Sequence, residues 1–287
     1  MSCVGIDVGG TKLLVSTYSG PQLRSAEVPV PPTTEILLNT LDNLFHTLGV
    51  SQLGAIGVGI PGVVQSSGTC WTPNCPAVNG VALSEVLRNR FGVPVVVDND
   101  ARLALRAESR IGRAQGFLNV LLVAVGTGIG GSIMADGRII RGQQQTAGSF
   151  GWLRMRQGNE WVTWENIASG RQLDALAAGL GIAGGRGLVD KAREAPGPYR
   201  DALDGWIESL GNGIAGLTSV FDPELVLISG GIIRDADFLL PRLRTVVHRQ
   251  SSPATGSVLI EAASLGHQAT AVGAFFHASD YGERRIP

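Results

Sequence analysis

The chain has 287 residues and a formal net charge of −1, with 44% hydrophobic and 16% charged residues. This length and composition supply enough apolar material for a two-lobed enzyme. A charge so close to zero leaves no electrostatic footprint for nucleic acid or an anionic membrane, so we expect neither as a partner.

The N-terminus enters a predicted strand within a few residues of Met1, and no apolar run reaches membrane-spanning length. We therefore expect no signal peptide and no added DNA-binding domain, and we expect a cytoplasmic protein. Cys3, Cys70 and Cys75 lack the paired spacing of a zinc site. They are predicted to be free thiols.

The first motif is a glycine turn between two apolar strands, over residues 5–15. Asp7 precedes the turn, which contains Gly9, Gly10, Thr11 and Lys12. Glycines can take φ > 0 and let backbone N–H groups converge on an anion, while the threonine adds a hydroxyl and the lysine a charge. Because a bare carboxylate would repel phosphate, Asp7 is expected to act through Mg²⁺, which it would hold through water. The alternative is an ordinary hairpin turn with incidental polar residues.

A second copy of this pattern favours phosphate binding. An apolar run over residues 118–125 enters a turn that contains Thr127 and Gly128, and the chain leaves it as a second apolar run over 132–135. A third strand, over 225–228, runs into Gly230 and Gly231 and is expected to open a helix beside adenine or ribose. The repetition implies a duplicated α/β fold, as in the actin-like and hexokinase-like ATPases.

Between the first two turns, strands alternate with helices. Thr33 or Thr34 is predicted to cap a helix that ends at Gly49, and a buried strand follows over residues 55–60. A further strand, over 93–97, ends in Asp98-Asn99-Asp100 before a helix over 101–111. Polar residues at the carboxyl end of a parallel strand point into the ligand crevice of an α/β protein. One of the three can instead simply cap the helix.

The second half of the chain is predicted to be mainly helical. Residues 165–180 and 199–221 are interpreted as helices, and residues 181–187 and 195–198 as loops or a hinge. The apolar stripe of the helix over 199–221 indicates core or a subunit interface.

These motifs, in their order and spacing, resemble the ROK family of sugar kinases over nearly the whole chain. The matching segments are Asp7 to Lys12, Gly59 to Gly62, Asp98 to Ala101, Gly126 to Gly131, Glu165 to Gly170 and Phe221 to Gly231. The resemblance implies a two-lobed, ribonuclease H-like duplication with a cleft between lobes. We assign residues 1–113 and 270–287 to a smaller N-terminal lobe, and 114–269 to a larger C-terminal lobe.

The resemblance also implies transfer of the ATP γ-phosphate to a hydroxyl of a hexose or amino sugar, with glucose as the first expectation. Asp100 would be the general base, Asn99 and Glu165 would bind other hydroxyls, and Gly62 would line the sugar site. The expected cofactors are ATP and Mg²⁺, and the expected assembly is a homodimer. The chemistry supports such a set, because a sugar hydroxyl is a poor nucleophile and needs a proton acceptor.

The chain departs from the family at two places. Where sugar-phosphorylating members usually have Gly-Glu-x-Gly-His, it has Ser149 and Trp152 in place of the carboxylate and the imidazole. We keep both positions as substrate-binding candidates and expect altered hexose selectivity. The family's zinc loop corresponds to residues 156–164, which contain neither Cys nor His, so we expect no structural zinc. Trp161 and Trp164 are expected to pack this loop instead.

Two other functions are compatible with the fold. One is a catalytically weak sugar or nucleotide sensor, which would not need the base Asp100. The other is an actin-like ATPase with protein partners, which would not need Asn99, Asp100 and Glu165 at one site. The sequence leaves open which sugar is used, which hydroxyl attacks, and whether ATP or polyphosphate is the donor.

Overall fold

A computed structural model describes residues 2–283, which divide into two compact units. Of these residues, 2–115, 141–147 and 265–283 form unit 1, and 116–140 and 148–264 form unit 2. Residues 114–115, 141–147 and 265–269, which we assigned to the C-terminal lobe, group with unit 1 instead.

Unit 1 is built on a five-stranded sheet with the order β3-β2-β1-β4-β7. Strands β1 to β3 form an antiparallel meander, and β4 and β7 extend it with parallel pairing. A two-stranded ribbon, β5-β6, lies outside this sheet. The strand bounds are Ser2–Val8 (β1), Lys12–Ser19 (β2), Gln22–Pro29 (β3), Leu53–Ile60 (β4), Val63–Val64 (β5), Cys70–Trp71 (β6) and Val95–Asn99 (β7).

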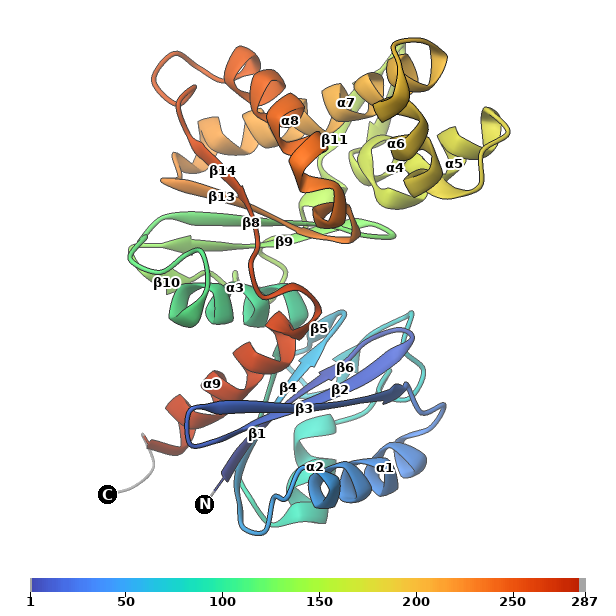
Figure 1. Cartoon of the computed structure of the whole chain (residues 1–287). Coiled ribbons are helices and arrows are strands. Elements are labelled where there is room, and N and C mark those ends of the chain that lie inside the picture. Colours follow the sequence, from blue (N-terminus) through green and yellow to red (C-terminus); the bar gives the residue numbers. More distant parts are fainter. Residues whose placement is uncertain (1, 284–287) are drawn as a thin grey trace. The chain divides into compact units, whose positions relative to one another are not determined.

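The helices of unit 1 cover both faces of this sheet (Figure 1). Helices α1 (Thr34–Thr47) and α2 (Leu83–Phe91) bury leucines in the core on one face, and α9 (Ala269–Glu283) packs on β1 and β4 from the other. Helix α3 (Asp100–Ile111) packs against α9. Thr33 caps α1 by accepting from the Ile36 N–H, as one of the two predicted caps.

Unit 2 repeats the sheet topology of unit 1. Its strand order is β10-β9-β8-β13-β14, with the first three antiparallel and the last two added in parallel. The predicted duplication is therefore confirmed strand by strand. The bounds are Val120–Val125 (β8), Ile129–Ala135 (β9), Arg138–Ile139 (β10), Leu225–Gly230 (β13) and Leu259–Ala262 (β14).

Helices of unit 2 gather around its core, with α7 and α8 seen together in Figure 1. The predicted helix over 199–221 is confirmed as α7. Beyond Gly231, a 3-10 turn precedes α8. The bounds are Glu165–Ala168 (α4), Gly170–Gly179 (α5), Gly184–Glu194 (α6), Pro198–Phe221 (α7), Gly231–Asp235 (the 3-10 turn) and Ala236–Gln250 (α8).

Two helix predictions in unit 2 were wrong. The single helix expected over 165–180 is interrupted at Ser169, whose extended backbone lets its hydroxyl accept from the Gln172 N–H and cap α5. The loop expected over 181–187 contains the first turn of α6. A Cβ on Gly185 would lie 2.8 Å from Leu173, and the Gly185 N–H donates to Asp174 at 2.6 Å. The glycines thus allow α6 to pack against α5.

The segment at the family's zinc loop is a β-hairpin, β11 (Arg154–Gln157) with β12 (Glu160–Thr163). Trp164 is fully buried and its indole N–H donates to the Ser209 carbonyl at 2.9 Å, which confirms its packing role. Trp161 is 58% exposed, so the expectation that it packs the loop was wrong. The two side chains do not form the expected pair, because Trp164 is buried in the core of unit 2 and Trp161 is exposed on β12.

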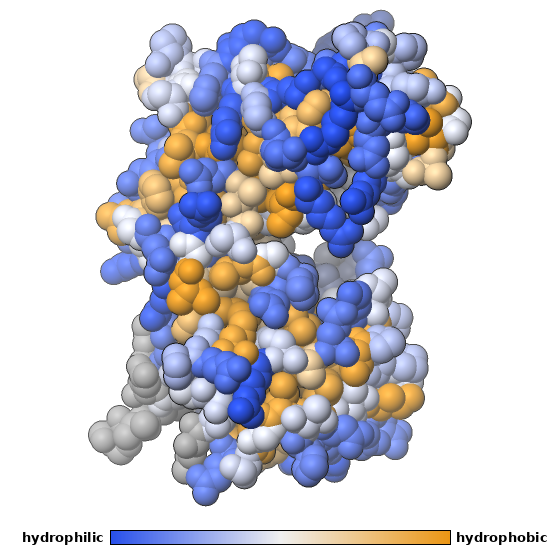
Figure 2. Space-filling model, in the orientation of Figure 1, coloured by the Kyte–Doolittle hydropathy of each residue, from blue (hydrophilic) through white to orange (hydrophobic). Residues whose placement is uncertain are grey.

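No helix within residues 2–283 combines the length and the apolar character needed to cross a bilayer. Hydrophilic and apolar residues are interspersed over the face shown in Figure 2. Cys70 and Cys75 are buried, Cys3 is partly buried, and all three are free thiols as predicted.

Helix α9 approaches the sheet of unit 1 at backbone distance. Gly5 and Gly57 are partners across the parallel β1-β4 pair. A Cβ on Gly5 would lie 1.8 Å from the Ala271 carbonyl oxygen, and one on Gly57 would lie 1.9 Å from that of Ala274. Glycine is therefore required at both positions, since backbone cannot move aside as a flexible side chain can.

We predict that Gly57→Ala destabilises the protein by about 1–3 kcal/mol or more, because the added methyl overpacks the contact between β4 and α9. Urea unfolding monitored by circular dichroism would measure it. Gly205→Ala is the matched control: Gly205 is an exposed position in α7 with open space at its Cβ. There alanine should stabilise by up to about 1 kcal/mol through helix propensity. Equal effects of the two substitutions would contradict the packing account.

Candidate active site

The first glycine turn closes the β1-β2 hairpin of unit 1. The Gly9 N–H donates to the Lys12 carbonyl at 2.9 Å, and a Cβ on Gly9 would lie 3.0 Å from that same oxygen. Neither Gly9 nor Gly10 has a left-handed φ, so the tight turn, rather than φ > 0, accounts for Gly9. Thr11 is exposed, and Lys12 is paired with Glu27 on β3.

Two carboxyl groups of unit 1 have strongly raised pKa values. Burial, and then the negative charges of Asp100 and Glu27, raise the pKa of Asp7 to about 8. Burial also raises the pKa of Asp100 to about 6, against the opposing effects of the Ala101 N–H, the Asn99 amide and the Arg102 charge. Both groups thus resist ionisation in the ligand-free protein, and a bound cation would favour their charged forms.

The three side chains of the Asp98-Asn99-Asp100 junction, between β7 and α3, make different contacts. Asn99 caps α3 by accepting from the Arg102 N–H, and its amide donates to the Gly62 carbonyl at 3.1 Å and to Asp100 Oδ1 at 2.9 Å. Asp98 is buried and paired with Arg102. The structure therefore brings three predicted site residues, Gly62, Asn99 and Asp100, together in unit 1.

Gly62 is needed for packing. A Cβ there would lie 2.1 Å from the Trp71 carbonyl oxygen. The absence of a side chain keeps the Gly62 carbonyl within reach of the Asn99 amide, which in turn contacts Asp100. A packing constraint thus fixes the orientation of the candidate base.

In unit 2, Glu165 lies against the second glycine turn. Its Oε2 atom accepts from the Ile129 N–H at 3.4 Å, and Cβ atoms on Gly128 and Gly151 would lie 2.6 and 2.9 Å from that oxygen. The two glycines therefore make room for the carboxylate. Gly151 belongs to the 3-10 turn Phe150–Trp152, which follows the exposed Ser149 and ends in Trp152, 70% exposed.

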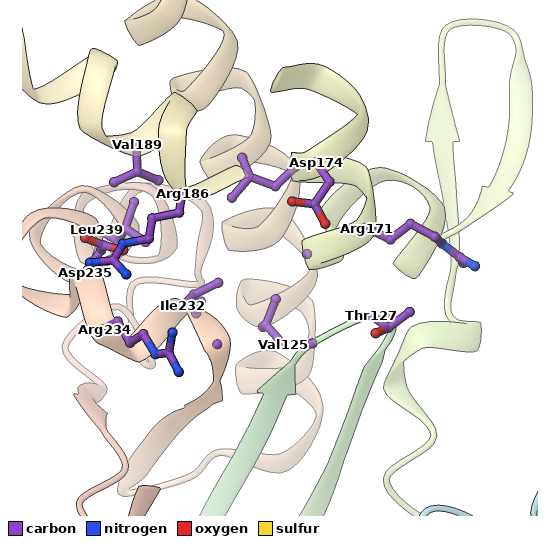
Figure 3. A pocket seen from close by; sticks show the side chains of 14 residues that line it. Val125, Thr127, Arg171, Asp174, Arg186, Val189, Ile232, Arg234, Asp235 and Leu239 are labelled. Carbon is purple, nitrogen blue, oxygen red and sulfur yellow. The ribbon is translucent and has the colours of Figure 1, made fainter. Parts of the chain in front are cut away.

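A cavity of about 330 Å³ opens beside the same turn, entirely within unit 2 (Figure 3). One end has the glycine turn with Thr127, and the first turn of α5 with Gly170. The Gly170 N–H donates to the Gly126 carbonyl at 2.7 Å, which ties the turn to the start of that helix. The other end has the apolar side chains of Val189, Ile232 and Leu239, and the charged side chains of Arg186, Arg234 and Asp235 lie beside them (Figure 3).

Gly230 and Gly231 bring the third glycine element to this cavity. Gly231 lines it, and Gly230 has φ +93° with its Cβ position 2.1 Å from the Val125 carbonyl oxygen. Sequence reasoning thus found Thr127 and Gly231 but missed the helical wall. The missed lining residues include Gly170, Arg171, Asp174, Arg186, Val189, Arg234 and Leu239. The glycine-rich start of α6, interpreted as a loop, concealed Arg186 and Val189.

The repeated sheets and their glycine turns define the two-lobed actin-like ATPase class. A family model described as the ROK family matches residues 3–280, and the chain belongs to this family. The glucokinase of Streptomyces coelicolor is 31% identical over a 308-residue alignment that covers 94% of this chain and 95% of the relative.

Solved structures agree with this assignment. The ROK family glucokinase from Streptomyces griseus, in complex with glucose and AMPPNP, is 27% identical with a TM-score of 0.80, and the match covers 98% of this chain and 100% of that one. The ROK hexokinase from Thermus thermophilus is 27% identical with a TM-score of 0.83, covering 99% and 100%. The family resemblance stated from the motifs is confirmed.

We predict that Asp7→Asn stabilises the ligand-free protein, and does so more at pH 8 than at pH 5. The pKa of Asp7 is about 8 in the fold against a usual 3.8, so the folded state binds a proton that the unfolded chain releases. Stability from this group is thus complete below pH 4 and is lost as the pH rises through 8.

Urea unfolding of the wild type and the variant at both pH values, without Mg²⁺ or nucleotide, would test this prediction. Adding Mg²⁺ and an ATP analogue should stabilise the wild type more than the variant. A stability difference that does not change between the two pH values would show that Asp7 is not a buried, raised-pKa carboxyl group.

Proposed function

We propose that the protein transfers the γ-phosphate of ATP to a hydroxyl of a hexose or amino sugar, with glucose as the first candidate. Membership of the ROK family, together with relatives that are glucokinases, identifies a carbohydrate kinase. One observation carries the mechanism. Asp100 starts α3, contacts Asn99, and has a pKa raised by burial to about 6.

The cavity of unit 2 suits an adenine nucleotide. Its apolar lining residues Leu173, Val189, Ile232 and Leu239 offer a surface for a flat base, with Arg186, Arg234 and Asp235 also in the lining, while Thr127 and the backbone at the start of α5 lie where phosphates would bind. Polyphosphate has no base to fill the apolar end. The shape and chemistry of the cavity therefore favour ATP as the donor.

Asp100 has the properties of a general base. A carboxylate with a pKa near 6 is largely ionised at neutral pH, yet it accepts a proton more readily than an ordinary aspartate. The Asn99 amide and the Ala101 N–H hold its Oδ1 atom, at 2.9 and 2.8 Å. Asp100 would thus take the proton of the attacking hydroxyl, while Asn99 positions the base and binds a neighbouring hydroxyl.

The residues of unit 1 fit a bound Mg²⁺. Mg²⁺ in phosphotransfer sites uses one or two carboxylates together with waters and substrate phosphates. Asp7, whose ionised form is disfavoured by burial and by Asp100, is the residue that would hold it, through water. When bound, Mg²⁺ would neutralise charge on the ATP phosphates. Structural zinc is not part of the proposal, since the β11-β12 hairpin has neither Cys nor His.

We predict that Asp100→Asn lowers kcat by about 10²- to 10⁴-fold, because the amide keeps the shape and removes the proton acceptor. Nucleotide affinity and the thermal midpoint should change little. With saturating Mg²⁺-ATP, wild-type kcat should rise with pH through about 6, the pKa of Asp100.

A coupled ADP-release assay from pH 5 to pH 9 measures both effects. Asp201→Asn, at an exposed position of α7, is the matched control and should behave as wild type. A variant that keeps more than about a tenth of the wild-type kcat would exclude Asp100 as the base.

We predict that glucose is used with a high KM, because Ser149 and Trp152 replace a carboxylate and an imidazole. Each lost charge-assisted hydrogen bond is worth about 1.5–3 kcal/mol, or roughly one to two orders of magnitude in affinity. The double change Ser149→Glu with Trp152→His should lower the glucose KM. A micromolar wild-type KM that the double change leaves unaltered or worsens would refute a sugar-binding role for these positions.

A further inference from the structure

A second cavity, of about 520 Å³, lies entirely within unit 1 and is not lined by the proposed acceptor residues. Its walls come from the β5-β6 ribbon, the end of β7, and residues 141–146. The volume falls within the roughly 300–1,000 Å³ of small-molecule pockets. Neither the proposed base nor the nucleotide cavity accounts for it.

The cavity adjoins the proposed acceptor residues along two segments. Val63, which lines it, follows Gly62, and Asp98, which also lines it, precedes Asn99. Hydrogen bonds connect these residues: Asp98 Oδ1 accepts from the Asn99 N–H at 2.7 Å, and the Asn99 amide donates to Gly62. A sugar held by Gly62, Asn99 and Asp100 would therefore have this cavity beside it.

The floor of the cavity has one carboxylate, Asp98, between two guanidinium groups. Asp98 accepts from Arg102 through Oδ1 at 2.6 Å and from Arg141 through Oδ2 at 2.7 Å. Arg102 also donates to the Gln145 carbonyl at 2.9 Å, and Gln145 has a left-handed φ of +59°. This contact anchors the segment 141–147 to α3 despite the strained backbone. The carboxylate is therefore occupied by the protein's own cations.

The remaining walls have the chemistry of a carbohydrate subsite. Trp71 lines the cavity and is 53% exposed, so it offers a flat apolar face. Gln143 and Gln144 line it too, and within residues 2–283 their side-chain amides have no hydrogen-bond partner to displace. Each amide has donors and an acceptor, which match vicinal hydroxyls. The half-exposed Arg141 guanidinium adds further donors, and together with the amides and the aromatic face these groups can hydrogen-bond the hydroxyls of a polyol.

We infer that this cavity is an extension subsite for a glycosyl substituent, so that the preferred acceptor is a disaccharide or glycoside. This inference rests on the proposed function and specifies its substrate class. The β7-α3 junction would hold the ring that is phosphorylated. Trp71 and the two glutamines would hold the second ring.

The test compares glucose with cellobiose, maltose and gentiobiose in the ADP-release assay. At least one disaccharide should have a kcat/KM at least fivefold above that of glucose. Trp71→Ala should lower that disaccharide's kcat/KM at least fivefold while changing the value for glucose less than twofold. Trp71→Phe should restore most of the loss because it keeps an aromatic face.

Trp161→Ala is the matched control, since Trp161 is similarly exposed but lies on the β11-β12 hairpin of unit 2. It should leave both acceptors unchanged. Phosphorylation of glucose with no disaccharide preferred would overturn the subsite while leaving the kinase proposal intact. An equal loss for glucose and disaccharide in Trp71→Ala, or inhibition by the disaccharides without their phosphorylation, would also overturn it. Failure of every sugar to release ADP would instead refute the proposed function, and the subsite with it.

Discussion

The close contact between α9 and the sheet of unit 1 is the constraint on which the candidate base depends. Gly5 and Gly57 give the helix room on the sheet, and a Cβ on Gly273 would lie 1.8 Å from the Leu103 carbonyl oxygen of α3. Helix α9 thus touches the sheet and α3 with almost no side chain between them. Because α3 begins at Asp100, this packing fixes the base relative to the strands beneath it.

At Asp7 and Asp100, the groups that the proposed function needs lower the stability of the ligand-free protein. Burial places Asp7 and Asp100 where ionisation is unfavourable, and the negative charge of Asp100 raises the pKa of Asp7 further. A fold selected only for stability would have neutral side chains there. The proposed mechanism accounts for this cost, because in it Asp7 acts with a cation and Asp100 accepts a hydroxyl proton.

Strong local patterns in the sequence were sufficient to predict the duplicated fold. Strand-turn-strand segments around Gly9, Thr127 and Gly230 indicated the repeat, and the repeated strand orders confirm it. Asn99 and Asp100 were selected as candidates because three successive polar residues at the end of a strand exceed what one helix cap requires, and Asn99 proves to be that cap as well. The lining of the proposed nucleotide cavity was predicted only at the glycine motifs.

The features that the sequence did not predict depend on tertiary contacts. Glycines in α6 disfavour a helix locally. The helix is nevertheless stabilised because Gly185 packs against Leu173 and its N–H donates to the Asp174 carboxylate. Trp161 and Trp164 are three residues apart and have similar neighbours in the sequence. Only the path of the chain in three dimensions decides that Trp164 is buried and Trp161 is exposed. The cavity beside Trp71 draws residues 141–146 from a distant part of the sequence, where no motif marks them.

The position of α9 in the chain has a consequence for biosynthesis. The helix that covers one face of the N-terminal sheet is translated after the whole of unit 2, more than 150 residues beyond β7. The strands of unit 1 therefore leave the ribosome with an apolar face uncovered, whereas the sheet of unit 2 is complete at β14. Unit 2 can fold first during synthesis, whereas unit 1 has to wait for α9, so its incomplete sheet is the part of the nascent chain most exposed to aggregation.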